Sequence, residues 1–271
     1  MRWMVGVMAA GMVMGMKAGA QSLPTTSPTQ IPAQVTTPAA VPPPPANPAM
    51  NQEEERKMEA DNARMKSQME DWAGLGRYRA ADLALPATEP GRVVFYGDSI
   101  TDAWTLNGGS FFPGKPYVNR GISGQTTPQM LVRFRQDVVD LHPEAVVILA
   151  GTNDLAGNTG PSTAKMIEDN FQSMVEIAKA NGIRVILASV TPVATYPWRP
   201  SVADVPAKIV GLNAWIKDYC SQQKLTYLDY WNAMAGPDGG MKPGISLDGV
   251  HPNAAGYAIM QPLAEAAIAA K

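Results

Sequence analysis

The sequence contains few of the residues that bind metals or form disulfides. Its 271 residues include one cysteine, Cys220, and two histidines. A disulfide within the chain is therefore excluded, and a zinc site has almost no Cys or His ligands to use. A basic excess is also lacking, since 22 Lys and Arg stand against 24 Asp and Glu. That balance argues against nucleic acid as a partner, because binding a phosphate backbone requires a basic surface.

Beyond the N-terminal residues the sequence lacks long apolar runs. No segment there reaches the roughly 20 residues that are needed to span a bilayer. Residues 1–20 have the pattern of a signal peptide: Arg2, an apolar stretch over 3–16, and small residues at 18–20. We expect cleavage after Ala20, a secreted or periplasmic protein, and no stable membrane insertion afterwards. The alternative is an uncleaved anchor.

The next two segments differ sharply in composition. Residues 21–50 hold nine of the 24 prolines and predict a disordered, Pro/Thr-rich linker, because proline removes hydrogen-bond donors and fixes φ. Residues 51–72 predict an amphipathic helix, with Met58, Met65, Met69 and Trp72 on one face. We expect this face to pack on the domain that follows, or the helix to be partly free of it.

Residues 73–271 predict a single α/β domain. Apolar runs that suit strands buried on both faces alternate with helical patterns. The expected strands are 93–97, 117–121, 145–150, 185–190 and 225–228, and the expected helices are 127–138, 162–180, 205–219 and 253–270 with a kink or restart at Pro262. This alternation predicts a parallel sheet of five strands.

Polar residues follow the expected strands, where open α/β sheets bind ligands. Ser99 follows the first strand, Gly121 the second and Asn153 the third, while His251 precedes the last helix. We therefore expect segments far apart in the sequence to meet at one edge of the sheet.

These residue types suit acyl transfer. A serine hydroxyl is a weak nucleophile until a base takes its proton, and histidine is the side chain with a suitable pKa. His142 precedes the third strand and belongs to the opposite edge, so His251 is the candidate base. Asp248 can orient it, and the Ser99 N–H, the Gly121 N–H and the Asn153 amide can hold the oxyanion.

Four segments resemble the sequence blocks of the SGNH hydrolases, also called the GDSL lipase/esterase family. They are Gly97–Thr101, Asn119–Gly124, Gly151–Asp154 and Asp248–Pro252. The resemblance covers about residues 90–270 and implies a flavodoxin-like three-layer α/β/α domain with no metal or cofactor. It implies Ser99 as nucleophile, His251 as base and Asp248 as its acid, with Ser99, Gly121 and Asn153 forming the oxyanion hole.

Several residues near these segments have alternative interpretations. Asp98 and Asp154 are expected to cap helices or hold turns rather than act chemically. The loop after the fourth strand holds Tyr196, Trp198 and Arg199, which form either one wall of the substrate cleft or a surface loop. Cys220 is expected to be a packing residue.

The predicted function is an exported serine esterase for short acyl groups, including acetyl on carbohydrate, so its partner is a small-molecule or polysaccharide ester. A lysophospholipase or thioesterase is the alternative within this class. A two-metal phosphoesterase would need more histidines, and an α/β-hydrolase would have glycine where Thr101 stands. The non-enzyme alternative is an extracytoplasmic glycan-binding module.

Overall fold

The computed structural model describes residues 52–270, apart from the side chains of three residues in the first helix. The expected signal peptide at 1–20 and the expected linker at 21–50 lie outside these residues and stay predictions.

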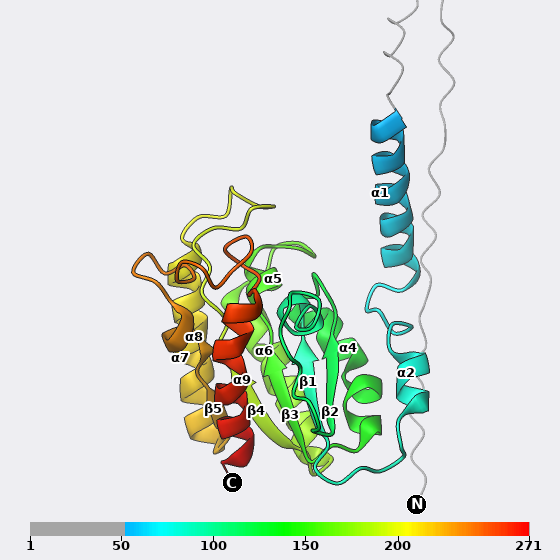
Figure 1. Cartoon of the computed structure of the whole chain (residues 1–271), viewed down its shortest axis with the longest axis vertical. Coiled ribbons are helices and arrows are strands. Elements are labelled where there is room, and N and C mark those ends of the chain that lie inside the picture. The colour runs from blue at the N-terminus through cyan, green and yellow to red at the C-terminus, as the bar shows by residue number, and fades with distance from the viewer. Residues whose placement is uncertain (1–51, 271) are drawn as a thin grey trace, which may run out of the picture. The chain divides into compact units, whose positions relative to one another are not determined.

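Five parallel strands form one sheet in the order β2-β1-β3-β4-β5 (Figure 1). This confirms the prediction of a five-stranded parallel sheet, with every strand end within two residues of the expected one. The strands are β1 (Val93–Gly97), β2 (Tyr117–Gly121), β3 (Ala145–Leu149), β4 (Arg184–Ala188) and β5 (Thr226–Leu228).

The strand register places the polar segments at one edge. Gly97 at the end of β1 pairs with Gly121 at the end of β2 and with Leu149 at the end of β3. The chain leaves β1 toward β2 and returns to the other side of β1 as β3, which makes this edge a switch point where α/β sheets bind ligands.

Alternate residues of each strand enter two separate cores. Val94, Tyr96, Val146 and Ile148 belong to one, packed against α4 (Thr127–Asp137), α6 (Ala164–Ala180) and α7 (Val205–Gln223). Their neighbours along the strands belong to the other, packed against α8 (Tyr230–Met234), α9 (Ala254–Ala269) and the aromatic residues that follow β1. The domain is therefore a three-layer α/β/α sandwich, as predicted.

Helix α9 runs through Pro262 as one element, so the expected restart does not occur. The missing N–H of proline removes one backbone hydrogen bond. Buried residues on both sides of it, Tyr257, Met260 and Ala264, hold the two halves on the same core.

Helix α1 (Gln52–Glu70) begins within one residue of the predicted start. Met58, Met65 and Met69 are all exposed, Met69 to 87%, so of the two expected arrangements the exposed face fits a helix that is partly free of the domain. In the part of the chain that the structure describes, no helix is long and apolar enough to cross a membrane.

Residues 71–92, here called the N-terminal extension, run along β2 and α4 before β1 begins. The extension includes the short helix α2 (Arg79–Ala84). Tyr78 donates from its hydroxyl to the Gly121 carbonyl, and Arg120 donates from Nε to Asp82 Oδ1 at 2.8 Å. These contacts fix the extension to the domain beside the polar edge of the sheet.

Candidate active site

Ser99 opens the short helix α3 (Ser99–Asp102) directly after β1. Asp98 caps this helix, since its Oδ1 accepts a hydrogen bond from the Ile100 N–H at 2.9 Å, which is the local role expected from the sequence. Burial raises the pKa of Asp98 to about 7. The Ser99 N–H has no hydrogen-bond partner among the described residues, so it is available to a ligand.

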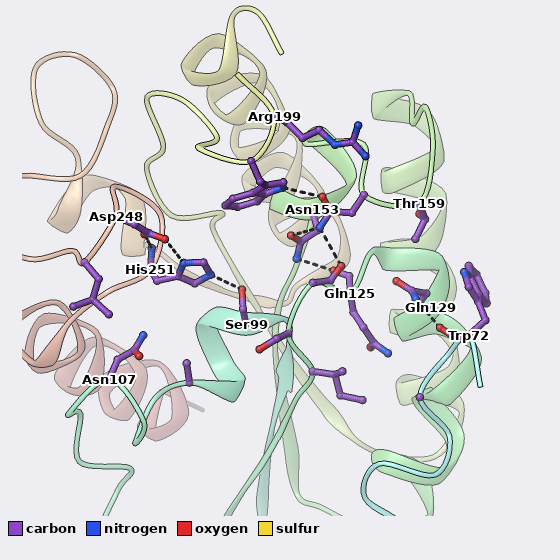
Figure 2. A pocket seen from close by; sticks show the side chains of 18 of the residues that line it. Trp72, Ser99, Asn107, Gln125, Gln129, Asn153, Thr159, Arg199, Asp248 and His251 are labelled. Atoms are coloured by element: carbon purple, nitrogen blue, oxygen red, sulfur yellow. Dashed lines mark hydrogen bonds and ion pairs between the residues drawn. The ribbon is translucent and has the colours of Figure 1, made fainter. Parts of the chain in front are cut away.

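Ser99, His251 and Asp248 form a hydrogen-bonded line (Figure 2). His251 Nε2 lies 2.9 Å from Ser99 Oγ, and His251 Nδ1 lies 2.8 Å from Asp248 Oδ2. An ionised carboxylate can only accept, so Nδ1 carries the proton and Nε2 is left as an acceptor toward the hydroxyl. The arrangement can therefore remove a proton from Ser99.

The loop that carries His251 also fixes Asp248. Asp248 Oδ1 accepts from the N–H groups of His251 and Val250 at 2.8 and 2.9 Å. Partial burial raises the pKa of Asp248, but these bonds and the contact with the imidazole outweigh it and hold the pKa below its ordinary value. Asp248 therefore remains an anion behind the imidazole.

Asn153 lies in α5 (Thr152–Leu155), directly after β3. Its Nδ2 donates to the Gln125 carbonyl at 3.0 Å, and its Oδ1 accepts from Asn158 Nδ2 at 2.8 Å. These contacts orient the amide with Nδ2 toward the loop after β2. One of the two Nδ2 hydrogens is left for a ligand in the cavity that Asn153 shares with Ser99.

Gly121 does not have the environment expected of an oxyanion donor. Its N–H donates to Asn119 Oδ1 at 2.9 Å, and it is not among the residues that line the cavity. A Cβ at this position would lie 2.1 Å from the Asp102 nitrogen. Glycine is required here because β2 and α3 approach closely, so the prediction for Gly121 is wrong.

Gly124, three residues later, lines the cavity with Ser99 and Asn153. It has a φ of +80° in a turn that closes from the Gln125 N–H to the Ile122 carbonyl, a conformation that favours glycine. Its carbonyl accepts from Asn158 Nδ2 at 3.2 Å, while its N–H has no partner among residues 52–270. Gly124 belongs to one of the segments that resemble the family, but no sequence pattern predicts the turn that exposes its N–H.

The cavity has a volume of about 780 Å³ and an open mouth. Trp198 and Arg199 line it, as predicted for one wall of a cleft. Tyr196 does not, because it is buried, with its hydroxyl 3.0 Å from Thr152 Oγ1. On the other side, the N-terminal extension contributes Trp72, which the sequence had assigned to a helix face.

The remaining candidates lie away from the cavity or support it from behind. Asp154 is buried and accepts from the Thr127 N–H and hydroxyl, which caps α4, and burial raises its pKa to about 6. His142 precedes β3 at the opposite end of the sheet, and Cys220 is buried, both as expected. Among the described residues, no group of three His, Cys, Asp or Glu could hold a metal ion.

Known proteins share this fold. The chain is 45% identical to a crystal structure described as an acylhydrolase from Bacteroides fragilis NCTC 9343, over 73% of this chain and 97% of that one, with a TM-score of 0.71. An acetylxylan esterase, Axe2 from Geobacillus stearothermophilus, has the same fold at 19% identity, over 69% of this chain and 98% of that one, with a TM-score of 0.54.

The chain spans about a third of the length of the curated relatives it matches. One of them is the uncharacterized lipoprotein YqeF of Bacillus subtilis, 37% identical over 79 residues, which are 28% of this chain and 32% of that protein. The model of the GDSL-like lipase/acylhydrolase family matches residues 95–259, which include Ser99, Asn153 and His251. The chain therefore belongs to the GDSL-like lipase/acylhydrolase family.

Proposed function

We propose that the protein is an exported serine esterase in which Ser99, His251 and Asp248 form a catalytic triad. The observation that carries this proposal is the 2.9 Å contact between Ser99 Oγ and His251 Nε2, with Asp248 behind the imidazole. Ser99 Oγ attacks the ester carbonyl carbon, and its proton passes to His251 Nε2. Collapse of the tetrahedral intermediate breaks the bond to the alcohol, which leaves with that proton.

The second half of the reaction repeats these steps with water. His251 takes a proton from a water molecule, whose oxygen attacks the acyl-enzyme carbonyl. The bond to Ser99 Oγ then breaks, the carboxylic acid leaves and Ser99 regains its proton. Asp248 holds the Nδ1 proton throughout, so the same Nε2 accepts and returns each proton.

Three donors would hold the oxyanion: the Ser99 N–H, the Asn153 Nδ2 and the Gly124 N–H. Gly124 replaces Gly121, whose N–H is occupied by Asn119. All three residues line one cavity, and each has a hydrogen without a partner among the described residues. Fixed donors of this kind stabilise the charge that develops on the carbonyl oxygen.

The proposed substrate carries a short acyl group, such as acetyl, on a carbohydrate. Eight of the 19 residues that line the cavity have amide or hydroxyl side chains and five are apolar, a mixed lining that suits a polar substrate with a small acyl group. The fold relative named an acetylxylan esterase supports the same substrate class. The lipoprotein relative YqeF and the apolar N-terminal stretch support export.

The experiment compares wild type with Ser99→Ala on p-nitrophenyl esters from acetate to octanoate, on acetylated xylan and on lysophosphatidylcholine. We expect wild-type kcat/KM to be highest for acetate and the Ser99→Ala variant to be inactive at an unchanged Tm. Residual activity near the wild-type level would exclude Ser99 as the nucleophile. A preference for octanoate or lysophosphatidylcholine would exclude the short-acyl carbohydrate substrate.

A further inference from the structure

Trp72 is the feature of the cavity that the family match leaves unexplained. It lies in the N-terminal extension, before the matched residues 95–259, and yet it lines the same cavity as Ser99. Its side chain is 46% exposed. A large indole on the wall of a cleft leaves apolar surface in water, which is typical of a ligand-binding groove.

The backbone that carries Trp72 is held firmly. Gln129 Nε2 donates to the Trp72 carbonyl, and Gln125 Nε2 donates to the carbonyl of Ala73, each at 2.6 Å. Asp71 accepts from the N–H groups of Leu75 and Gly76, each at 2.7 Å. Gln125 and Gln129 are themselves cavity-lining residues, so the indole is presented from a backbone anchored to the cavity wall.

A second tryptophan lies near the other end of the cavity, beside His251. Trp198 is 40% exposed and its Nε1 donates to Asn158 Oδ1 at 3.0 Å. Its ring centroid is 6.2 Å from that of His251. Figure 2 shows Trp72 and His251 on opposite sides of the pocket, with Ser99 between them. The cleft thus has an aromatic ring beside the imidazole and another beyond the nucleophile.

Polar side chains line much of the rest of the cavity, beside the apolar Ala103, Ile122 and Leu247. The polar ones are Ser123, Gln125, Gln129, Asn153, Asn158 and Thr159. A lipid chain would need a continuous apolar surface, whereas a sugar presents hydroxyls at its edge and apolar C–H groups on its face. A cavity with two separated tryptophans and several amide and hydroxyl side chains therefore suits a chain of sugars better than a lipid.

We propose that Trp72 is a stacking platform for a second sugar ring, so that the substrate is an O-acylated glycan of at least two residues. This inference rests on the proposed esterase function. The acylated sugar lies beside Ser99 and Trp198, and the next sugar packs its face on the Trp72 indole. A volume of about 780 Å³ is far more than an acetyl group requires, and the glycan occupies the remainder.

The test is the ratio of two kcat/KM values, one for an O-acetylated oligosaccharide and one for p-nitrophenyl acetate. The oligosaccharides are acetylated xylose, mannose and glucose oligomers of one to six residues. The variants are Trp72→Ala, Trp72→Phe and, as matched control, Leu75→Ala. Leu75 is similarly exposed in the same extension but does not line the cavity.

We expect Trp72→Ala to lower this ratio about tenfold, mainly through KM, for at least one series from the dimer upward. Trp72→Phe should keep the ratio within about threefold of wild type, and Leu75→Ala should not change it. An unchanged ratio in Trp72→Ala for every series would overturn the inference. So would a Trp72-dependent rate on lysophosphatidylcholine micelles without one on glycans, because that result indicates a lipid surface.

Titration of the glycans into Ser99→Ala and Ser99→Ala/Trp72→Ala by calorimetry separates this inference from the proposed function. Weaker binding by the double variant is the expected result, and equal binding would contradict the platform. If Ser99→Ala instead hydrolysed p-nitrophenyl acetate, the proposed triad would be wrong. The effect of Trp72→Ala in the protein that keeps Ser99 would still test the stacking platform.

Discussion

Asn158 Nδ2 donates to Asn153 Oδ1 over 2.8 Å and to the Gly124 carbonyl over 3.2 Å. One amide group therefore fixes the two residues that we propose as oxyanion donors beside Ser99. The first contact makes Oδ1 of Asn153 an acceptor, which leaves Nδ2 to donate. The second holds the turn in which Gly124 presents its N–H.

Replacing Asn153 by alanine should remove one oxyanion donor. We expect a loss of about 2.7 to 4 kcal/mol of transition-state stabilisation, seen mostly in kcat. Steady-state kinetics on p-nitrophenyl acetate measure it, with the melting temperature as a control for folding. A rise in KM at constant kcat would show that Asn153 only binds the substrate.

Replacing Asn158 by alanine should act through Asn153 and Gly124 without removing a donor. The expected fall in kcat is about tenfold, smaller than for Asn153→Ala, because the donors remain but are less well oriented. In the double variant, the Asn158 substitution should add less loss than it causes alone, since its contact with Asn153 is already gone and only its contact with Gly124 is left to break. Fully additive losses in this cycle would contradict the positioning role.

Alanine at Gly121 and at Gly124 should have different effects. At Gly121 the new Cβ meets the Asp102 backbone at 2.1 Å, so we expect destabilisation of about 3 kcal/mol or more. At Gly124 the nearest atom is 4.0 Å away, so the cost is the positive φ, about 1 to 2 kcal/mol, together with reduced activity. Denaturant unfolding of both variants checks this order. Equal stability of Gly121→Ala and wild type would refute the close approach.

The buried carboxyl of Asp98 should make stability depend on pH. Its pKa is 3.8 when unperturbed and about 7 in the folded protein, because burial disfavours the charge. Between these values the folded state keeps a proton that the unfolded chain has released, so the free energy of unfolding falls as pH rises from about 4 to about 7. Asp98→Asn removes this contribution and keeps an acceptor for the Ile100 N–H.

Melting temperatures at pH 5 and pH 8 test this sign. From pH 5 to pH 8 the melting temperature should fall less for Asp98→Asn than for wild type. The difference should be about 2 to 4 degrees for each kcal/mol of pH-dependent stability that the substitution removes. Asp154, whose pKa burial also raises, leaves part of the dependence in place. The exposed Asp140→Asn variant is the matched control. An equal decrease in Asp98→Asn and wild type would mean that the Asp98 carboxyl is already charged in the folded protein at pH 5.

Most of the sheet could be predicted from the sequence because its three central strands, β1, β3 and β4, are largely continuous apolar runs followed by polar or glycine segments. Runs such as Val93–Gly97 are buried on both faces, so the pattern is local and strong. The same reasoning placed Ser99, Asn153 and His251 at one edge, where the structure brings them together. The contact of His251 with Ser99 joins residues 152 positions apart, which follows from parallel topology rather than from any local pattern.

The failed predictions concern residues whose environment depends on distant chain. Gly121 and Gly124 lie in one short segment, and only the approach of α3 and the turn after β2 distinguish them. Tyr196 lies two residues from Trp198 but is buried beneath the loop. Trp72 fitted a helical spacing, and its actual position depends on Gln129, 57 residues away, through a bond to a backbone carbonyl that no side-chain pattern reports.

Gln125 connects two parts of the protein that sequence comparison separates. Its backbone carbonyl receives the Asn153 amide, and its side chain donates to Ala73 in the N-terminal extension. A protein truncated to the family match would leave this glutamine and its neighbours Gln129 and Gln136 without their carbonyl acceptors. The unit that must be expressed as a whole thus begins upstream of the family match, near Asp71.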